Sequence, residues 1–206
     1  MMTGNRITNV WTVALVAMCV AAFSASTVVA APVTVANPSF EAGTPPASWG
    51  PDGWTRAGGT NAGRYDGATS GGQSGTDGSY WLWVNKNVTV YQDTGEVIVE
   101  GTTYTLTVDV GGAFWDGQSA TFRLYGSTLG YGTALGGAEN TVAVGNVSVS
   151  WEIDQTVSFT ATATEAGQTL GIALLGASPT QGVYDNVRLE ADAPAAATPG
   201  TLIYGK

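Results

Sequence analysis

The chain has 206 residues, a formal net charge of −9 and no histidine. This length predicts one domain, and the acidic balance argues against a nucleic-acid partner. The lack of histidine and the single cysteine exclude histidine-based catalytic triads, histidine-rich zinc sites and a disulfide framework.

Residues 1–31 have the pattern of a secretory signal peptide. A short polar stretch with Arg6 precedes an apolar run from Val10 to Phe23, and mostly small residues follow up to Ala31. The apolar run is shorter than the about 20 residues that a membrane span needs. We therefore expect a secreted or cell-envelope protein with no transmembrane segment after signal cleavage.

Between residues 32 and 190 the sequence alternates with period two and shows no helical stripe. In the clearest strand, residues 103–110, Tyr104, Leu106, Val108 and Val110 share one face. Further strands are predicted at 80–85, 88–92, 120–125, 146–153, 156–162, 169–175 and 182–190. The Gly-rich stretch 58–79 is predicted to be a long surface loop or a pair of loops. The pattern predicts one all-β domain, an antiparallel β-sandwich of the jelly-roll type.

The Ala-, Pro- and Thr-rich residues 191–206 are expected to form a flexible tail. Before it, the alternation of the last predicted strand places Asp185 on the face of Val183, Val187 and Leu189, which should be the core. An ionised carboxylate in a core needs a partner, and a bound Ca²⁺ with oxygen ligands would offset its desolvation. The alternative is an Asp185 that is exposed at a strand end or accepts backbone N–H bonds in a turn. Glu41, in the first predicted strand, offers a second carboxylate.

Three groups of segments resemble family 4 carbohydrate-binding modules and related galactose-binding-like jelly rolls. They are Asn37-Pro38-Ser39-Phe40-Glu41 with Gly53-Trp54, then residues 100–106, and finally residues 158–163 with 171–174 and the closing Tyr184-Asp185-Asn186-Val187-Arg188-Leu189. The resemblance implies a structural calcium ion near the first and last strands. Carried over by position, its ligands are the Ser39 carbonyl, the Glu41 side chain, the Gly78 carbonyl and Asp185.

The same resemblance implies a sugar-binding groove, and Tyr131 resembles one of its aromatic residues. Trp115 lies in a Gly-rich loop, and its sequence context is compatible both with contact to a ligand and with burial in the domain. Arg56, beside the long loop, either orients an acidic ligand group or is solvated or salt-bridged. Trp81 and Trp83 share one strand face and belong either to the core or to a sugar platform.

Three functions follow as hypotheses. The first is a secreted, non-catalytic, calcium-stabilised module that binds a glycan or another extracellular polymer. The second is an enzyme, because the Phe-Glu and Asp-Asn-Val-Arg-Leu motifs also resemble the calcium-dependent Stig cyclases, which rearrange indole terpenoids using acidic groups. Asp185 would then donate a proton, a role that conflicts with calcium ligation. The third is a structural or adhesive exoprotein that its tail tethers to the envelope.

Overall fold

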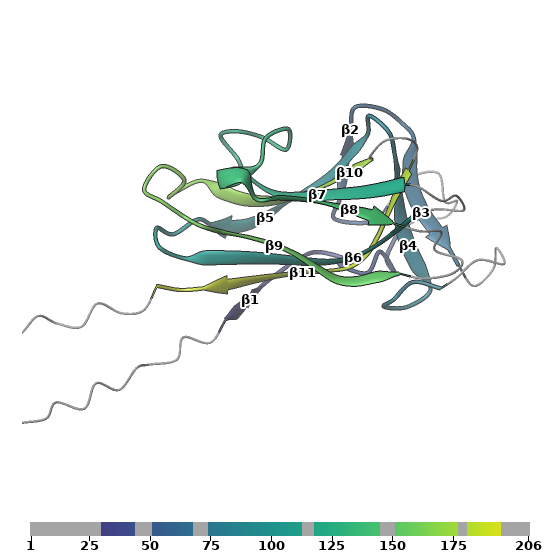
Figure 1. Cartoon of the computed structure of the whole chain (residues 1–206), viewed down its shortest axis with the longest axis horizontal. Coiled ribbons are helices and arrows are strands. Elements are labelled where there is room, and N and C mark those ends of the chain that lie inside the picture. The colour runs from purple at the N-terminus through teal and green to yellow at the C-terminus, as the bar shows by residue number, and fades with distance from the viewer. Residues whose placement is uncertain are drawn as a thin grey trace, which may run out of the picture.

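The computed structural model describes residues 30–43, 51–67, 74–112, 118–144, 151–176 and 181–194. They form two antiparallel sheets packed face to face, which confirms the predicted antiparallel β-sandwich (Figure 1). The predicted leader up to residue 29 and residues 195–206 of the predicted tail lie outside the described part of the chain.

The larger sheet has six strands. Five follow the order β3 (Ala62–Asp66), β4 (Tyr80–Asn85), β11 (Gln181–Asp192), β6 (Thr103–Gly112) and β9 (Glu152–Thr160), and β1 (Ala31–Val33) pairs with the far end of β11. The smaller sheet has the order β2 (Thr55–Ala57), β5 (Thr89–Val97), β10 (Thr169–Gly176), β7 (Gln118–Gly126) and β8 (Glu139–Val144). A short 3₁₀ turn, η1 (Leu135–Gly137), precedes β8.

The main core lies between the two sheets. Leu106, Val108 and Val110 of β6 are fully buried, as their alternation predicts, and Phe122 and Ile172 of the smaller sheet belong to the same cluster. Burial of this many aliphatic and aromatic side chains is the main favourable term in the folding free energy. The core therefore depends on the period-two pattern that is visible in the sequence.

A second, smaller apolar cluster lies on the outer face of the six-stranded sheet. Trp81 and Val183 are buried there, and Tyr65, Trp83 and Trp151 pack against them. We call these five residues the tryptophan cluster. In β4 the two tryptophans alternate with Leu82 and Val84, which face the main core. Trp81 is therefore buried, but outside the main core.

The predicted orientation of Asp185 is wrong in one respect. The register of β11 against β6 shifts between Asp185 and Arg188, and Asn186 has a left-handed φ of 49°. This β-bulge adds one residue, so Tyr184 and Val187 both join the main core while Asp185 shares the outer face with Val183. Asp185 is fully buried, but beside the main core and not within it.

Other differences also come from strand pairing. The stretch 58–79, predicted to be a loop, contains β3, which pairs with β4. The Gly-containing sequence of β3 has no alternation that would have predicted this strand. Residues 146–150 of the strand predicted at 146–153 lie outside the described part of the chain. β9 joins the end of that prediction to the strand predicted at 156–162, and Asp154 within it has a φ of 56°. Glu41 follows a turn and lies outside any strand.

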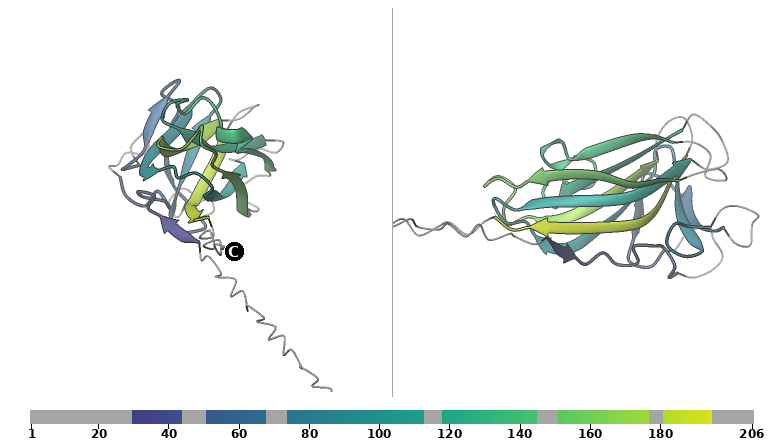
Figure 2. Two further views of the ribbon diagram at one scale, coloured as in Figure 1. Left: turned by 90° about the vertical axis from the view of Figure 1, so that its left-hand side faces the viewer. Right: turned by 60° about the horizontal axis from the view of Figure 1, so that its bottom comes forward.

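The two ends of the described domain are neighbours. Ala31 pairs with Ala191 and Val33 pairs with Leu189, so β1 lies beside the end of β11 (Figure 2). β11 ends at Asp192, two residues inside the stretch predicted as tail. Among the described residues, no helix is long and apolar enough to cross a bilayer.

Candidate functional site

Two carboxylates accept hydrogen bonds from one loop. Glu41 Oε1 accepts hydrogen bonds from the backbone N–H of Ser79 (2.8 Å) and of Tyr80 (2.6 Å). Asp185 Oδ2 accepts from the backbone N–H of Asp77 (3.0 Å) and from Thr76 Oγ1 (3.2 Å). We call Ser39, Glu41, Asp185 and the loop 75–80 the acidic loop site.

The other two predicted metal ligands lie in the same place. Ser39 Oγ donates to Asp77 Oδ2 at 2.5 Å. Gly78 has a φ of 105°, and a Cβ atom there would overlap the Glu41 carboxylate, so this position requires glycine. The structure thus brings Ser39, Glu41, Gly78 and Asp185 to one loop, together with Asp77, which the sequence did not single out.

The Asp185 carboxyl is fully buried, and burial raises its pKa to about 7 even though it accepts several hydrogen bonds. Its partners, the N–H groups of Asp77 and Asn186 and the Thr76 hydroxyl, carry no formal charge. A bound cation would offset this desolvation cost.

The donor chemistry of the acidic loop site fits Ca²⁺, which prefers carboxylate and carbonyl oxygens. Within the described ranges, no three His, Cys, Asp or Glu side chains come close enough to hold a metal. An ion at this loop would therefore need neutral oxygens besides the two carboxylates, and the Ser39 and Gly78 carbonyls are the predicted ones.

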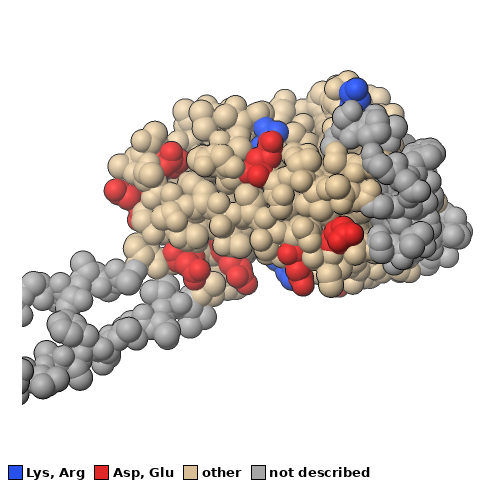
Figure 3. All heavy atoms as spheres, in the orientation of Figure 1, with Lys and Arg blue, Asp and Glu red and all other residues tan. Residues whose placement is uncertain are grey.

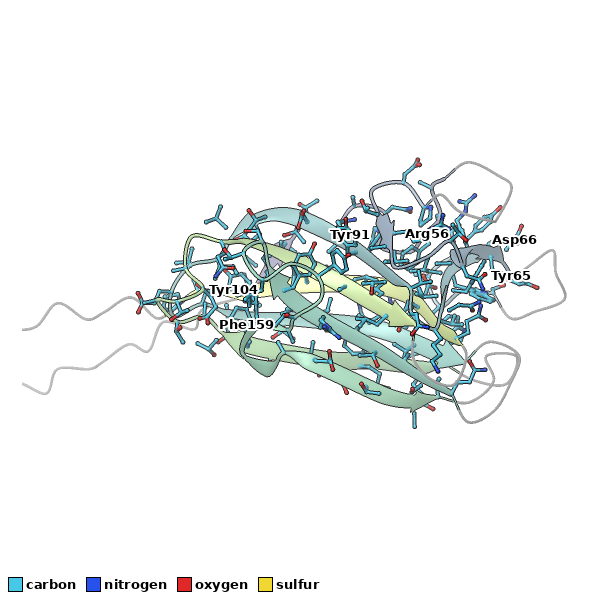
Figure 4. All side chains as sticks on the ribbon, turned by 90° about the horizontal axis from the view of Figure 1, so that it is seen from above. Arg56, Tyr65, Asp66, Tyr91, Tyr104 and Phe159 are labelled. Carbon is cyan, nitrogen blue, oxygen red and sulfur yellow. The ribbon has the colours of Figure 1, made fainter. Side chains whose placement is uncertain are left out.

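The tryptophan cluster spans the outer face of four strands. Trp83 pairs with Val183, Val183 pairs with Gly111, and Tyr65 pairs with Trp81 in the strand registers. The Tyr65 and Trp81 rings are 4.5 Å apart between centroids, and Trp151, one residue before β9, meets Trp81 edge-on at 6.4 Å. Figure 4 places Tyr65 at the end of the sandwich opposite to Tyr104 and Phe159.

A second buried carboxylate lies next to Asp185. Asp109 of β6 is opposite Asp185 in the register and is 2% exposed. Its oxygens accept from the Asp154 N–H (2.8 Å), the Asn186 side-chain amide (3.1 Å) and Arg188 (3.4 Å). Arg188 also pairs with Asp154 at 2.7 Å. Asp109 therefore has a cationic partner, whereas the hydrogen-bond partners of Asp185 are neutral.

A tyrosine face lies on the outer side of the smaller sheet. Tyr131, 36% exposed, stacks on Tyr91 with ring centroids 4.5 Å apart, and Tyr125 meets Tyr91 edge-on at 6.3 Å. The Tyr125 hydroxyl donates to Asp93 at 2.7 Å, and burial raises its pKa. We call Tyr91, Tyr125 and Tyr131 the tyrosine face; the sequence suggested only Tyr131.

Two hydrogen bonds of Arg56, another predicted ligand residue, lie at a turn. Arg56 donates to the carbonyls of Thr60 (2.5 Å) and Ala62 (3.2 Å), which supports the turn between β2 and β3. Trp115 lies outside the described residues. Acidic side chains are spread over the face shown in Figure 3, as the net charge of −9 leads one to expect.

Known structures share this fold. A cyclase from Fischerella sp. TAU is 24% identical with a TM-score of 0.64, and 82% of this chain aligns with 100% of that one. The Stig cyclase Fisc from Fischerella sp. TAU, in complex with (3Z)-3-(1-methyl-2-pyrrolidinylidene)-3H-indole, is 23% identical with a TM-score of 0.63, covering 81% of this chain and 100% of the other.

A CBM22 tandem domain is also similar. The CBM22-1–CBM22-2 tandem domain of Xyn10C from Paenibacillus barcinonensis is 14% identical with a TM-score of 0.52, and the alignment covers 87% of this chain and 50% of that one. At these identities the likenesses show the fold alone, and they support the jelly-roll prediction.

The comparison with family models identifies the family of the chain. No curated protein matches the chain in sequence. The family model described as HpiC1 cyclase matches residues 31–190, which is nearly the whole of the described domain. The chain therefore belongs to the HpiC1-like family.

Proposed function

We propose that this protein is a small-molecule cyclase of the HpiC1-like type and that its ligand lies against the tryptophan cluster. The observation that carries the proposal is the joint presence of the family match over residues 31–190 and of a second aromatic cluster outside the main core. This function corresponds to the second hypothesis from the sequence and is better supported than the non-catalytic module.

The chemical class of the ligand follows from the cluster and its relatives. Flat aromatic compounds pack on tryptophan and tyrosine rings, and ring faces also stabilise cationic intermediates of the kind that proton-initiated cyclisation creates. Structures of cyclases from Fischerella sp. TAU contain 4-(1H-indol-3-yl)butan-2-one in one case and a 3H-indole compound in another. We therefore propose an indole-like ligand for this chain.

We also propose a structural calcium ion at the acidic loop site, held by Glu41, Asp185 and the carbonyl oxygens of Ser39 and Gly78. The support is the fully buried Asp185 carboxyl, whose hydrogen-bond partners are neutral, and the Glu41 carboxylate, which accepts from the same loop. An aspartate that ligates a cation gives up its proton, so Asp185 in the calcium-bound protein is a ligand and not the proton donor.

The test of the proposed function compares two faces of the sandwich. Binding of 4-(1H-indol-3-yl)butan-2-one is measured by calorimetry for the unchanged protein, for Trp83→Ala on the larger sheet and for Tyr131→Ala on the smaller sheet. We expect binding that Trp83→Ala weakens at least tenfold and that Tyr131→Ala leaves unchanged. No binding to the unchanged protein, or equal loss in both variants, would contradict a ligand at the tryptophan cluster.

A specific observation also favours a second function, glycan binding at the tyrosine face. Tyr131 is exposed and stacked on Tyr91, next to the Asp93 carboxylate, and aromatic rings beside polar groups are what sugars contact. The same two variants test it in pull-downs with a panel of insoluble and soluble polysaccharides. Retention that Tyr131→Ala abolishes and Trp83→Ala preserves would support it, and absence of retention over the panel would remove it.

A further inference from the structure

Trp151 has a buried hydrogen-bond donor without an acceptor. Its indole Nε1 is buried, and within the described residues no acceptor lies at hydrogen-bonding distance from it. Buried N–H groups are nearly always paired, so an orphan in a folded protein needs an explanation. The orphan belongs to a member of the tryptophan cluster, which is the proposed ligand site.

Trp151 differs from Arg123, which has the other buried, unpaired side-chain nitrogen among the described residues. Arg123 Nε is also buried without a partner, but the same guanidinium donates to the Gly132 carbonyl and pairs with Glu139 at 2.5 Å. An indole has one donor and no acceptor, so the entire hydrogen-bonding capacity of Trp151 is unused. Its ring is fixed edge-on against Trp81 at 6.4 Å.

The strand register explains why an acceptor can be brought there by a ligand. Gly111 separates Val183 from the β9 side of the sheet, and Gly63 is opposite Trp83 in β3. Neither glycine adds a side chain to the outer face, and both are buried in this structure. A flat ligand at the cluster would therefore have to displace what covers this row, and its acceptor atom could then reach Trp151 Nε1.

We infer that the ligand of the tryptophan cluster carries a hydrogen-bond acceptor oxygen or nitrogen beside its aromatic part, and that Trp151 Nε1 donates to this acceptor. Trp151 is thus a specificity-determining residue. The inference rests on the proposed function, since it names a property of the ligand that this function requires. A site built to donate a hydrogen bond rejects an analogue without the acceptor, because its own donor then stays unpaired.

The experiment uses two probes that differ by one acceptor, 4-(1H-indol-3-yl)butan-2-one and 3-butylindole. Their affinities are measured by calorimetry for the unchanged protein, for Trp151→Phe and for Trp83→Phe, which makes the same change at another tryptophan of the cluster. We expect the unchanged protein to prefer the ketone by roughly tenfold, the size of one net hydrogen bond. Trp151→Phe should reduce this ratio to about one, whereas Trp83→Phe should weaken both probes and keep the ratio.

A second measurement on the unchanged protein guards against misfolding of a variant. In spectra of ¹⁵N-labelled tryptophan, the Trp151 indole N–H resonance should move downfield with the ketone and not with 3-butylindole. If 3-butylindole binds as tightly as the ketone, or the ratio survives in Trp151→Phe, the inference is overturned while the proposed function stands. If neither probe binds the unchanged protein, both are overturned.

Discussion

Asp185 and Asp109 face each other across β11 and β6, and one asparagine links their two buried carboxylates. The backbone N–H of Asn186 donates to Asp185 Oδ1 at 2.8 Å, and its side-chain amide donates to Asp109 Oδ2 at 3.1 Å. The left-handed conformation of Asn186 lets one residue serve both neighbours. The bulge therefore both turns Asp185 outward and ties it to the adjacent strand.

Substitution of Asn186 should separate its conformational role from its side-chain role. Asn186→Gly keeps the left-handed backbone and loses the amide bond to Asp109, so we expect a cost of about 1 kcal/mol in the free energy of unfolding. Asn186→Val adds strain from a β-branched residue at positive φ, for a total of about 2–4 kcal/mol. Urea denaturation measures both, and equal losses would show that the backbone conformation contributes nothing.

Calcium should raise the thermal stability. An ion that binds only the folded protein adds about 2.7 kcal/mol at a hundredfold excess over its Kd, which is about 5–10 °C in Tm for a domain of this size. Thermal unfolding with Ca²⁺ and with excess chelator measures the shift, and Glu41→Gln should remove most of it. An unchanged Tm on chelation would refute the calcium site and leave Asp185 available as an acid.

The calcium-free protein should lose stability as the pH rises from about 4 to about 7. Burial raises the pKa of Asp185 to about 7 from a usual value near 4, so the folded state holds a proton in this range that the unfolded state has released. The stability that this proton on Asp185 adds is fully present below about pH 4 and is lost above about pH 7. Unfolding midpoints in calcium-free buffer should therefore fall with pH relative to those of Asp185→Asn. A rise relative to this variant would contradict the assigned direction.

Gly78 should be far less tolerant of alanine than Gly95. Both have positive φ, but a Cβ on Gly78 would meet the Glu41 carboxylate, whereas nothing lies within 4 Å of a Cβ on Gly95. Gly95→Ala should cost about 1 kcal/mol from backbone strain alone, and Gly78→Ala about 2–4 kcal/mol, because the loop or Glu41 must move as well. Denaturant midpoints compare them, and similar costs would show that the loop adapts freely.

Alternation predicted the strands whose partners lie on both sides. β4 begins and ends at the predicted residues, and β6 extends the predicted strand by two residues. β3 was not predicted because Gly63 and the buried Arg64 interrupt its apolar pattern. Its hydrogen-bonded pairing with β4, which the sequence does not show, defines it as a strand.

The candidate sites were predictable only in part. Strand alternation selected Asp185, and the motif resemblance then grouped it with Glu41. Both accept hydrogen bonds from one loop, although the bulge at Asn186 puts Asp185 on the face opposite to Val187 and Leu189. Strand phase grouped Trp81 with Trp83, but their contacts with Tyr65 and Trp151 depend on pairing between segments far apart in sequence. Bulges and registers of this kind are set by the neighbouring strand, which a single sequence does not display.

The pairing of β1 with the end of β11 determines how this domain can be handled and presented. β11 has 12 residues and reaches about 40 Å at the usual rise per residue, with Val183 near its start and Ala191 beside Ala31 near its end. Coupling the domain to a resin, a reporter or a scaffold protein through either of these strand ends would therefore leave the tryptophan cluster facing outward. A short peptide joining the two ends would allow circular permutants, with new ends opened in surface turns.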